Sequence, residues 1–159
     1  MFRIKLIALG TLKESFWREA LAEYEKRLAA YAKVEVAELK ECRLPENPSR
    51  AEIDAALEKE ADAIFAALPP RAYLAALCVE GKAISSTELA ALLQNAGETH
   101  GEIAFVIGSS FGLSPRVKAA ADFCLSLSAL TFPHQMTRVI LAETIYRSLS
   151  ILAGGKYHK

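Results

Sequence analysis

Short runs of strand-forming residues alternate along the chain with longer runs of helical periodicity, and this alternation restricts the fold more than any other feature. The run Ile103–Ile107 is apolar at every position, which is typical of a central strand covered on both faces. Ser49 and Ser85 each stand three residues before a glutamate, a capping box that marks the start of a helix. Regular β-α-β-α order predicts an α/β fold, a parallel sheet with helices on both faces.

The same patterns give approximate bounds for each element. Strands are expected over residues 2–9, 34–39, 73–79, 103–107 and 123–127, and helices over 13–31, 49–68, 85–96, 114–121 and 133–152. No repeat or internal linker interrupts the series. Residues 1–159 are therefore expected to form a single domain.

Three loops of the second half follow predicted strands, where parallel sheets bind their ligands. They are residues 80–82, 108–112 and 128–133. The sequence Gly-Ser-Ser-Phe-Gly at 108–112 allows backbone N–H groups to approach a ligand, but it suits an ordinary tight turn equally well. Segment 126–133 has exposed amides that can face an adenine edge, although its hydroxyls also suit a connector that satisfies its own backbone. The residues alone leave the loop 108–112 open between its two alternatives, and for segment 126–133 they favour the connector.

Composition excludes several classes of protein. Nineteen basic residues balance nineteen acidic ones, so bulk positive charge does not hold this chain to nucleic acid or a membrane. No apolar stretch is long enough to span a bilayer, and the charged start Met1–Lys5 predicts no signal peptide. Three scattered cysteines predict neither a disulfide framework nor a metal site. We therefore expect a cytoplasmic protein without a metal.

The last predicted helix and the tail carry further candidate functional side chains. His134 and Arg138 share one helix face, where they suit proton transfer and phosphate binding, although such residues are more commonly a cap and a surface charge. Glu143 and Arg147 have the spacing of a solvated ion pair. The helix is apolar around much of its circumference, which suggests a dimer contact. Residues 133–159 hold four basic residues against one acidic residue, and the Tyr157–Lys159 end suits contact with RNA.

Long segments of this sequence resemble one known family. They are Phe105–Gly108, Gly112–Leu113, Leu125–Met136, Arg138–Val139, Glu143, Tyr146–Arg147 and Tyr157–Lys159, with Ala8–Gly10 and Ala22–Leu28 in the first half. On these residues the chain resembles the small bacterial methyltransferases that modify N3 of pseudouridine in 23S ribosomal RNA, which are minimal members of the SPOUT class. The likeness runs along the whole chain.

The resemblance implies an α/β domain whose C-terminal part forms a trefoil knot, a topology that general folding rules discard. It also implies S-adenosylmethionine as the cofactor and a homodimer whose site lies between the subunits. By position, the cofactor-binding residues would be Leu77, Gly108, Leu127, Ser128, Ala129, Leu130, Thr131 and Phe132. Arg138 and Lys159 would contact the RNA, and the tail would join the site of the other subunit.

The implied function is methylation of N3 of a pseudouridine in 23S ribosomal RNA. A chain without net charge is a poor ligand for isolated RNA, so the expected substrate is the assembled ribosome or large subunit. Nitrogen N3 must lose its proton before it attacks, and Tyr157, His158 and His134 are candidates for stabilising the anion that develops. The sequence does not choose among them.

Two positions depart from the family pattern. Ser109 stands where a second glycine is usual, and Cys78 where an acidic residue is common. If position 109 requires φ > 0, serine costs about 1 kcal/mol there. These departures support a rival interpretation, a non-catalytic dimeric ribosome-binding module with a degenerate cofactor pocket. A flavodoxin-like nucleotide binder is a second rival.

Overall fold

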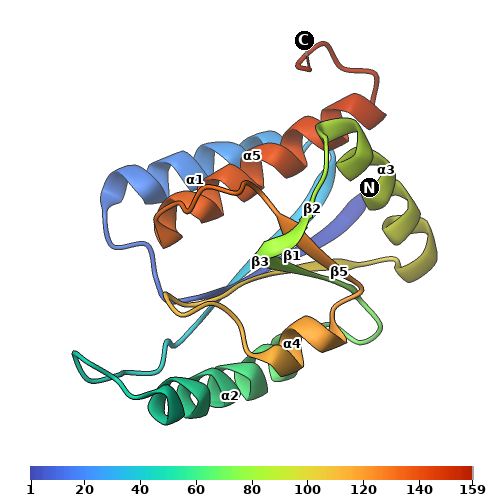
Figure 1. The fold of residues 1–159 in the computed structure, drawn as a ribbon. Coiled ribbons are helices and arrows are strands. Elements are labelled where there is room, and N and C mark those ends of the chain that lie inside the picture. The colour runs from blue at the N-terminus through green and yellow to red at the C-terminus, as the bar shows by residue number, and fades with distance from the viewer. Residues whose placement is uncertain (159) are drawn as a thin grey trace.

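The computed structural model describes residues 1–158, in which strands and helices strictly alternate (Figure 1). The strands are β1 (Phe2–Leu9), β2 (Ala32–Leu39), β3 (Tyr73–Ala83), β4 (Ile103–Ile107) and β5 (Phe123–Ser126). The helices are α1 (Ser15–Leu28), α2 (Arg50–Ala67), α3 (Ser86–His100), α4 (Pro115–Ala120) and α5 (His134–Leu152). The predicted α/β class is confirmed.

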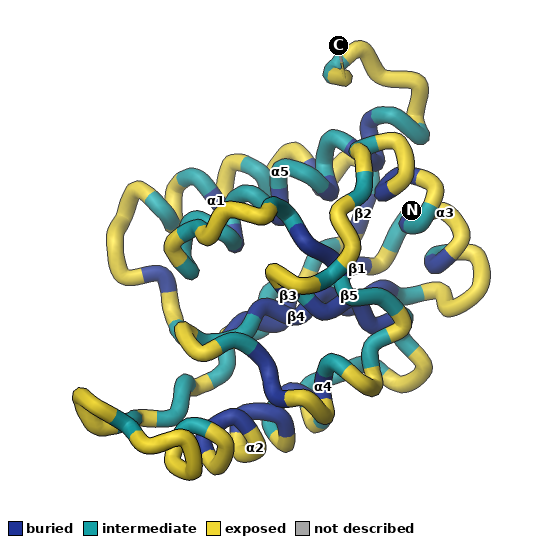
Figure 2. Tube along the Cα trace, in the orientation of Figure 1, coloured by how far each residue is buried: buried dark blue, intermediate teal, exposed yellow. Residues whose placement is uncertain are grey.

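The strands form a five-stranded sheet in the order β2-β1-β4-β3-β5, and every pair is parallel. All five residues of β4 are buried, as expected for the apolar run Ile103–Ile107 between two neighbours. Figure 2 shows these inner strands in dark blue, whereas the tail beyond α5 is mainly yellow.

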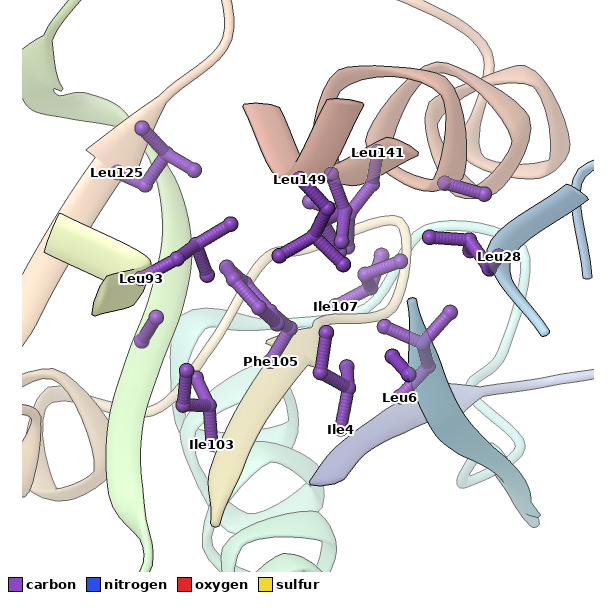
Figure 3. Close-up of a cluster of buried hydrophobic side chains, with 14 of the residues drawn as sticks. Ile4, Leu6, Leu28, Leu93, Ile103, Phe105, Ile107, Leu125, Leu141 and Leu149 are labelled. Carbon is purple, nitrogen blue, oxygen red and sulfur yellow. The ribbon is translucent and has the colours of Figure 1, made fainter. Parts of the chain in front are cut away.

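Helices cover both faces of the sheet. On one face α1, α3 and α5 pack over a cluster that includes Leu6, Phe105 and Leu141 (Figure 3). On the other face α2 and α4 pack over a smaller cluster that includes Ile7, Ile64 and Val117. Burial of these side chains on two faces of one sheet supplies the main stabilisation of the fold.

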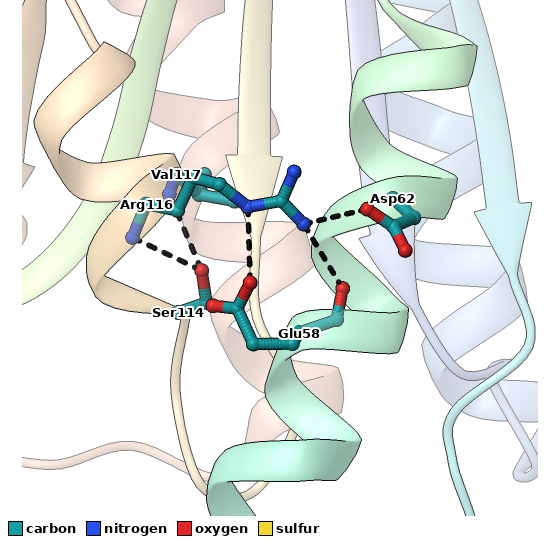
Figure 4. Close-up of polar contacts among 5 residues, drawn as sticks. All are labelled: Glu58, Asp62, Ser114, Arg116 and Val117. Carbon is teal, nitrogen blue, oxygen red and sulfur yellow. Dashed lines mark hydrogen bonds and ion pairs between the residues drawn. The ribbon is translucent and has the colours of Figure 1, made fainter.

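The predicted helix starts at Ser49, Ser85 and Ser114 are confirmed. Ser49 and Ser85 each form the complete capping box, and Ser114 Oγ accepts hydrogen bonds from the N–H groups of Arg116 and Val117. Arg116 also pairs with Glu58 and Asp62 of α2 (Figure 4). The short helix α4 is thereby fastened to its longer neighbour.

One expected loop is part of a strand. Residues 80–82 were predicted to end the third strand, but β3 continues to Ala83. Leu77 and Lys82 both stand opposite Leu125 of β5, so residues 78–81 leave the ladder as a bulge and the strand then resumes. The Gly81-Lys82 pair resembles a turn locally, and only pairing with the distant β5 extends the strand through it.

The connections after β3 and β4 leave the sheet in opposite directions. Helix α3 returns over one face and α4 over the other, although β3 and β4 are neighbours. The chain therefore opens a crevice at the carboxyl ends of these two strands, which is the position where open α/β sheets bind ligands.

Candidate functional site

A cavity of about 500 Å³ lies at this crevice. Its walls come from the β3 bulge, from the loop after β4 and from the segment between β5 and α5. The volume falls within the range of about 300–1,000 Å³ usual for small-molecule sites. Seven of the eight residues expected to bind a cofactor line it, namely Leu77, Gly108, Leu127, Ser128, Leu130, Thr131 and Phe132. Ala129, the eighth, does not line the cavity.

The loop after β4 is a tight turn that also forms one wall of the cavity. The N–H of Gly112 donates to the carbonyl oxygen of Ser109 at 2.8 Å. A Cβ at Gly108 would overlap the carbonyl oxygen of Gly112, so the turn requires glycine at position 108. The tight turn is therefore confirmed and forms one wall of the cavity, whereas ligand binding by 108–112 stays a prediction.

Ser109 is held by a buried carboxylate that sequence reasoning did not single out. Its hydroxyl donates to Oε2 of Glu60, on α2, at 3.0 Å. Glu60 is 4% exposed, and burial raises the pKa of its carboxyl. The two residues are 49 positions apart, so no local spacing in the sequence could have paired them.

Ser109 does not adopt the conformation that would make serine costly. Among residues 1–158, Arg71 is the only residue other than glycine with positive φ. Position 109 does not require φ > 0 in this chain, so serine causes no backbone strain there.

The segment after β5 satisfies much of its own backbone. Ser126 Oγ donates to the carbonyl oxygen of Ser128 at 3.1 Å, and Ser128 Oγ accepts from the N–H of Leu130 at 3.0 Å. The two hydroxyls therefore bind backbone groups of their own segment, as predicted for a connector. The segment lines the cavity at the same time, and the Leu130 side chain is 70% exposed.

His134 begins α5 at the edge of the cavity. Its Nε2 lies 3.0 Å from the carbonyl oxygen of Gly108, so the ring fastens the helix start to the loop after β4. Burial is the main cause of a lowered pKa, and the nearby Arg138 lowers the pKa of this ring further. The carbonyl can only accept, so the neutral ring carries its proton on Nε2 and keeps Nδ1 as an acceptor.

Arg138 lies in the interior, which contradicts the surface-charge interpretation of its position. The side chain is 1% exposed, and its guanidinium binds the carboxylate of Glu38 and, at 3.0 Å, the carbonyl oxygen of Gly10. The RNA contact implied for Arg138 is not available in the single chain, because these two groups and the surrounding core cover the guanidinium. Arg138 instead connects α5 to the carboxyl ends of β1 and β2.

The tail folds back on the far half of α5. Tyr157 OH donates to Glu143 Oε1 at 3.1 Å, and its ring lies under the Arg147 guanidinium, 4.6 Å from the centroid. The Glu143–Arg147 pair is therefore not the solvated ion pair expected, since both side chains are less than a third exposed. The Tyr146 ring contacts Tyr157 edge-on at 4.8 Å. Burial and the Glu143 contact raise the pKa of Tyr157.

The three candidate proton-handling residues do not meet within one chain. Helix α5 has 19 residues and is therefore about 28 Å long. His134 stands at its first residue, beside the cavity, whereas Tyr157 and the exposed His158 follow its last turn. Lys159 lies outside the described residues.

One charged pair lines the cavity. Lys118 of α4 pairs with Glu80 of the β3 bulge, and both residues contribute to the lining. The contact with Lys118 lowers the pKa of Glu80. A zwitterionic or hydroxyl-rich ligand would find both charges within this part of the wall.

Residues 1–158 contain neither a metal-binding cluster nor a membrane-spanning helix. No group of three or more His, Cys, Asp or Glu side chains is arranged to hold a metal ion. None of the helices in this part of the chain has the length and apolar character needed to cross a bilayer.

Comparison with known proteins identifies the family to which the chain belongs. Among solved structures, the chain is similar to the crystal structure of the SpoU methyltransferase AviRb from Streptomyces viridochromogenes in complex with the cofactor AdoMet, with 12% identity and a TM-score of 0.45. That match covers 98% of this chain but only 59% of the other. The model of the family described as predicted SPOUT methyltransferases matches residues 2–158, and the chain belongs to this family.

Proposed function

We propose that the protein is an S-adenosylmethionine-dependent methyltransferase that methylates N3 of a pseudouridine in 23S ribosomal RNA, with the assembled ribosome or large subunit as substrate. The observation that carries the proposal is the cavity at the β3–β4 crevice in a chain of the SPOUT methyltransferase family. The substrate rests on the sequence resemblance, which includes Leu125–Met136 and the Tyr157–Lys159 end.

The cavity has the chemistry that this cofactor requires. Leu77, Leu127 and Phe132 provide apolar surface for a purine ring, and the glycine at position 108 lets a ligand approach the main chain closely. Glu80 and Lys118 provide opposite charges for the ribose hydroxyls and the amino-acid end. The cofactor, when bound, supplies a methyl group on a sulfonium, which is already a strong electrophile. The protein then has to align the two reactants and handle one proton.

The non-catalytic alternative loses most of its basis. Ser109 adopts no strained conformation, and its hydroxyl is bound to Glu60. Where Cys78 replaces the usual acidic residue, Glu80 of the same bulge brings a carboxylate to the cavity two positions later. Both departures leave an open cavity, which supports the enzyme over the degenerate module.

A second copy of the chain would complete the site. Helix α5 starts at the cavity and ends at the tail, so a twofold axis across the middle of its outer face would bring each tail toward the other copy's cavity. Val79, Phe111 and Leu130 each come from a different wall of the cavity and are 57%, 48% and 70% exposed. Exposed apolar side chains around one opening are typical of a surface that a partner covers. We propose a homodimer on this basis, and a C-terminal knot on the basis of the resemblance.

The proton on N3 is then handled by groups of two chains. His134 keeps an acceptor nitrogen because its pKa is lowered and its Nε2 faces a carbonyl. Tyr157 and His158 would come from the tail of the other subunit, where a donor stabilises charge that develops on the base. We propose that these three residues act on the base and that Lys159 of the tail contacts the RNA, whereas the guanidinium of Arg138 is committed to Glu38 and Gly10.

The first test is calorimetry with S-adenosylmethionine. We expect one binding site per chain, whereas an absence of binding heat would leave the non-catalytic module. A flavin or phosphate ligand in the purified protein, detected by its absorbance spectrum or by phosphorus analysis, would favour the flavodoxin-like alternative instead.

The second test is mass spectrometry of ribosomal RNA from cells with and without the gene for this chain. We expect a methylated pseudouridine in 23S RNA only when the chain is present. In vitro, Tyr157→Ala and His158→Ala should lower turnover while cofactor binding is retained. Efficient methylation of a short naked stem-loop would contradict the proposed ribosomal substrate.

A further inference from the structure

A single acidic side chain lies deep in the smaller core. Glu60 is on the inner face of α2, next to Ala61 and one turn before Ile64, both of which belong to the buried cluster on this face. No lysine or arginine among residues 1–158 forms an ion pair with it. A buried carboxylate without a cation is costly, and burial accordingly raises its pKa.

Both carboxylate oxygens of Glu60 have one hydrogen-bond donor each. Oε1 accepts from the N–H of Cys42 at 3.0 Å, and Oε2 accepts from the hydroxyl of Ser109 at 3.0 Å. Cys42 follows β2, and Ser109 follows β4, and these two strands are the neighbours of β1. Glu60 therefore connects the chain segments on both sides of β1, at the edge of the sheet where the cavity lies.

The loop after β4 is thus held from both faces of the sheet. Helix α2 holds it through Glu60 and Ser109, and α5 holds it from the opposite face through His134 and the carbonyl of Gly108. Loop residues 108–112 all line the cavity. Any rotation of the loop away from Glu60 would change the shape of that wall.

We propose that Glu60 is a positioning residue, which sets the cofactor affinity of the cavity by fixing the loop 108–112 through the Ser109 hydroxyl. This inference rests on the proposed function, because it concerns the same cavity. Glu60 itself lies behind the loop and does not line the cavity, and its direct contact with the loop is the Ser109 hydroxyl. If the loop without this bond is in its binding conformation about one tenth of the time, the apparent Kd rises about tenfold.

Four variants test the proposal. Ser109→Ala removes the hydroxyl and leaves Glu60, and Glu60→Met removes the carboxylate at nearly the same side-chain length. Glu60→Gln is the conservative variant, because its amide can accept from Cys42 N–H and donate to the Ser109 oxygen. Ser148→Ala is the matched control, since it removes a buried hydroxyl that bonds Ser86 and Thr144 on the α3–α5 side.

The measurements are calorimetry with S-adenosylhomocysteine and hydrogen exchange of the loop amides. We expect Ser109→Ala and Glu60→Met to raise the Kd about tenfold and to speed exchange at 108–112. We expect Glu60→Gln and Ser148→Ala to stay within about twofold of the wild type. In assays of turnover, the KM for the cofactor should rise while kcat changes little.

The outcomes separate this inference from the function on which it rests. If the wild type binds neither S-adenosylhomocysteine nor S-adenosylmethionine, the proposed function fails. If the wild type binds and Ser109→Ala binds equally tightly with unchanged loop exchange, Glu60 is not a positioning residue. If Ser148→Ala weakens binding as much as Ser109→Ala, the effect is one of general stability and the inference is overturned. Should Glu60→Met not fold, Ser109→Ala and Glu60→Gln still decide the matter.

Discussion

The buried guanidinium of Arg138 binds the carboxylate of Glu38, so the start of α5 is fixed to the end of β2 by a charged contact across the sheet edge. The same side chain reaches the carbonyl oxygen of Gly10, just after β1. Its Nε is buried with no hydrogen-bond partner among residues 1–158. The position of α5 therefore depends on a cation that is 1% exposed and that cannot exchange its partners for water.

Glu38→Gln should destabilise the protein clearly. It leaves the Arg138 charge in the interior without its counter-charge, and breaking a fully buried pair costs about 3–5 kcal/mol. Because Glu38 itself is 40% exposed, we expect a smaller loss of unfolding free energy, about 2 kcal/mol. Urea denaturation at pH 7 measures it. The control is Glu35→Gln on the same strand, because its carboxylate is 64% exposed and its partner Lys5 is 16% exposed, against 1% for Arg138. Equal losses in the two variants would contradict the interior role of Arg138.

Glu60 should make the wild type less stable as pH rises. Its pKa is raised in the folded protein by burial, with Glu41 as the nearby charge that raises it further. Between the ordinary glutamate value and this raised value the folded state binds more protons than the unfolded state, so stability falls with increasing pH. Glu60→Gln lacks this dependence. The difference in unfolding free energy between the two proteins, measured from pH 4 to pH 8, should shift in favour of the variant. A difference that is constant over this range would show that Glu60 titrates normally.

His134 should stay neutral to a lower pH than a solvent-exposed histidine. Burial and Arg138 lower its pKa, while Glu41 opposes them weakly. As pH falls from the ordinary histidine value to the lowered one, the unfolded state binds more protons and the protein loses stability. An NMR titration of the imidazole resonances, compared with an unfolded peptide of the same local sequence, measures the shift. A midpoint at or above that of the peptide would contradict the burial of this ring beside the cavity.

Gly108→Ala should abolish cofactor binding. Its methyl group would overlap the carbonyl oxygen of Gly112, which is backbone and cannot rotate away as a side chain can. The loop would have to move, and the cavity wall with it. The control is Leu93→Ala on α3, which removes a fully buried side chain from the larger core cluster, beneath α1, α3 and α5. We expect Leu93→Ala to cost about 2–5 kcal/mol of stability while the folded fraction binds cofactor normally. Calorimetry at a temperature where both variants are folded makes the comparison.

Interactions between near neighbours in the sequence were predictable. The capping boxes at Ser49 and Ser85 join residues three positions apart, and the apolar run Ile103–Ile107 identifies a central strand without further information. The approximate place of the cavity followed from the same reasoning, because the loops after parallel strands share one edge of the sheet.

Contacts between distant segments were not predictable. The residues around Arg138 in the sequence are compatible with a surface charge. Only the packing of α5 against β1 and β2 buries its side chain. Glu60 looks like one more acid on a charged helix until α2 is placed against the loop after β4. Glu143 and Arg147 have the ordinary spacing of an exposed pair, and the returning tail covers them. In each case burial is decided by an element far along the chain.

The bulge in β3 separates the chemistry of one cavity wall from the folding of the sheet. The strand leaves its ladder after Leu77 and resumes at Lys82 opposite the same residue of β5, so the exposed Val79 and Glu80 can be changed without displacing any core position. Cys78, just before them, belongs to the smaller core cluster. Gly81 is also constrained, because a Cβ there would lie 2.5 Å from the carbonyl oxygen of Cys124. Ligand preference can therefore be altered by substitution at two adjacent positions, provided that the cysteine before them and the glycine after them are kept.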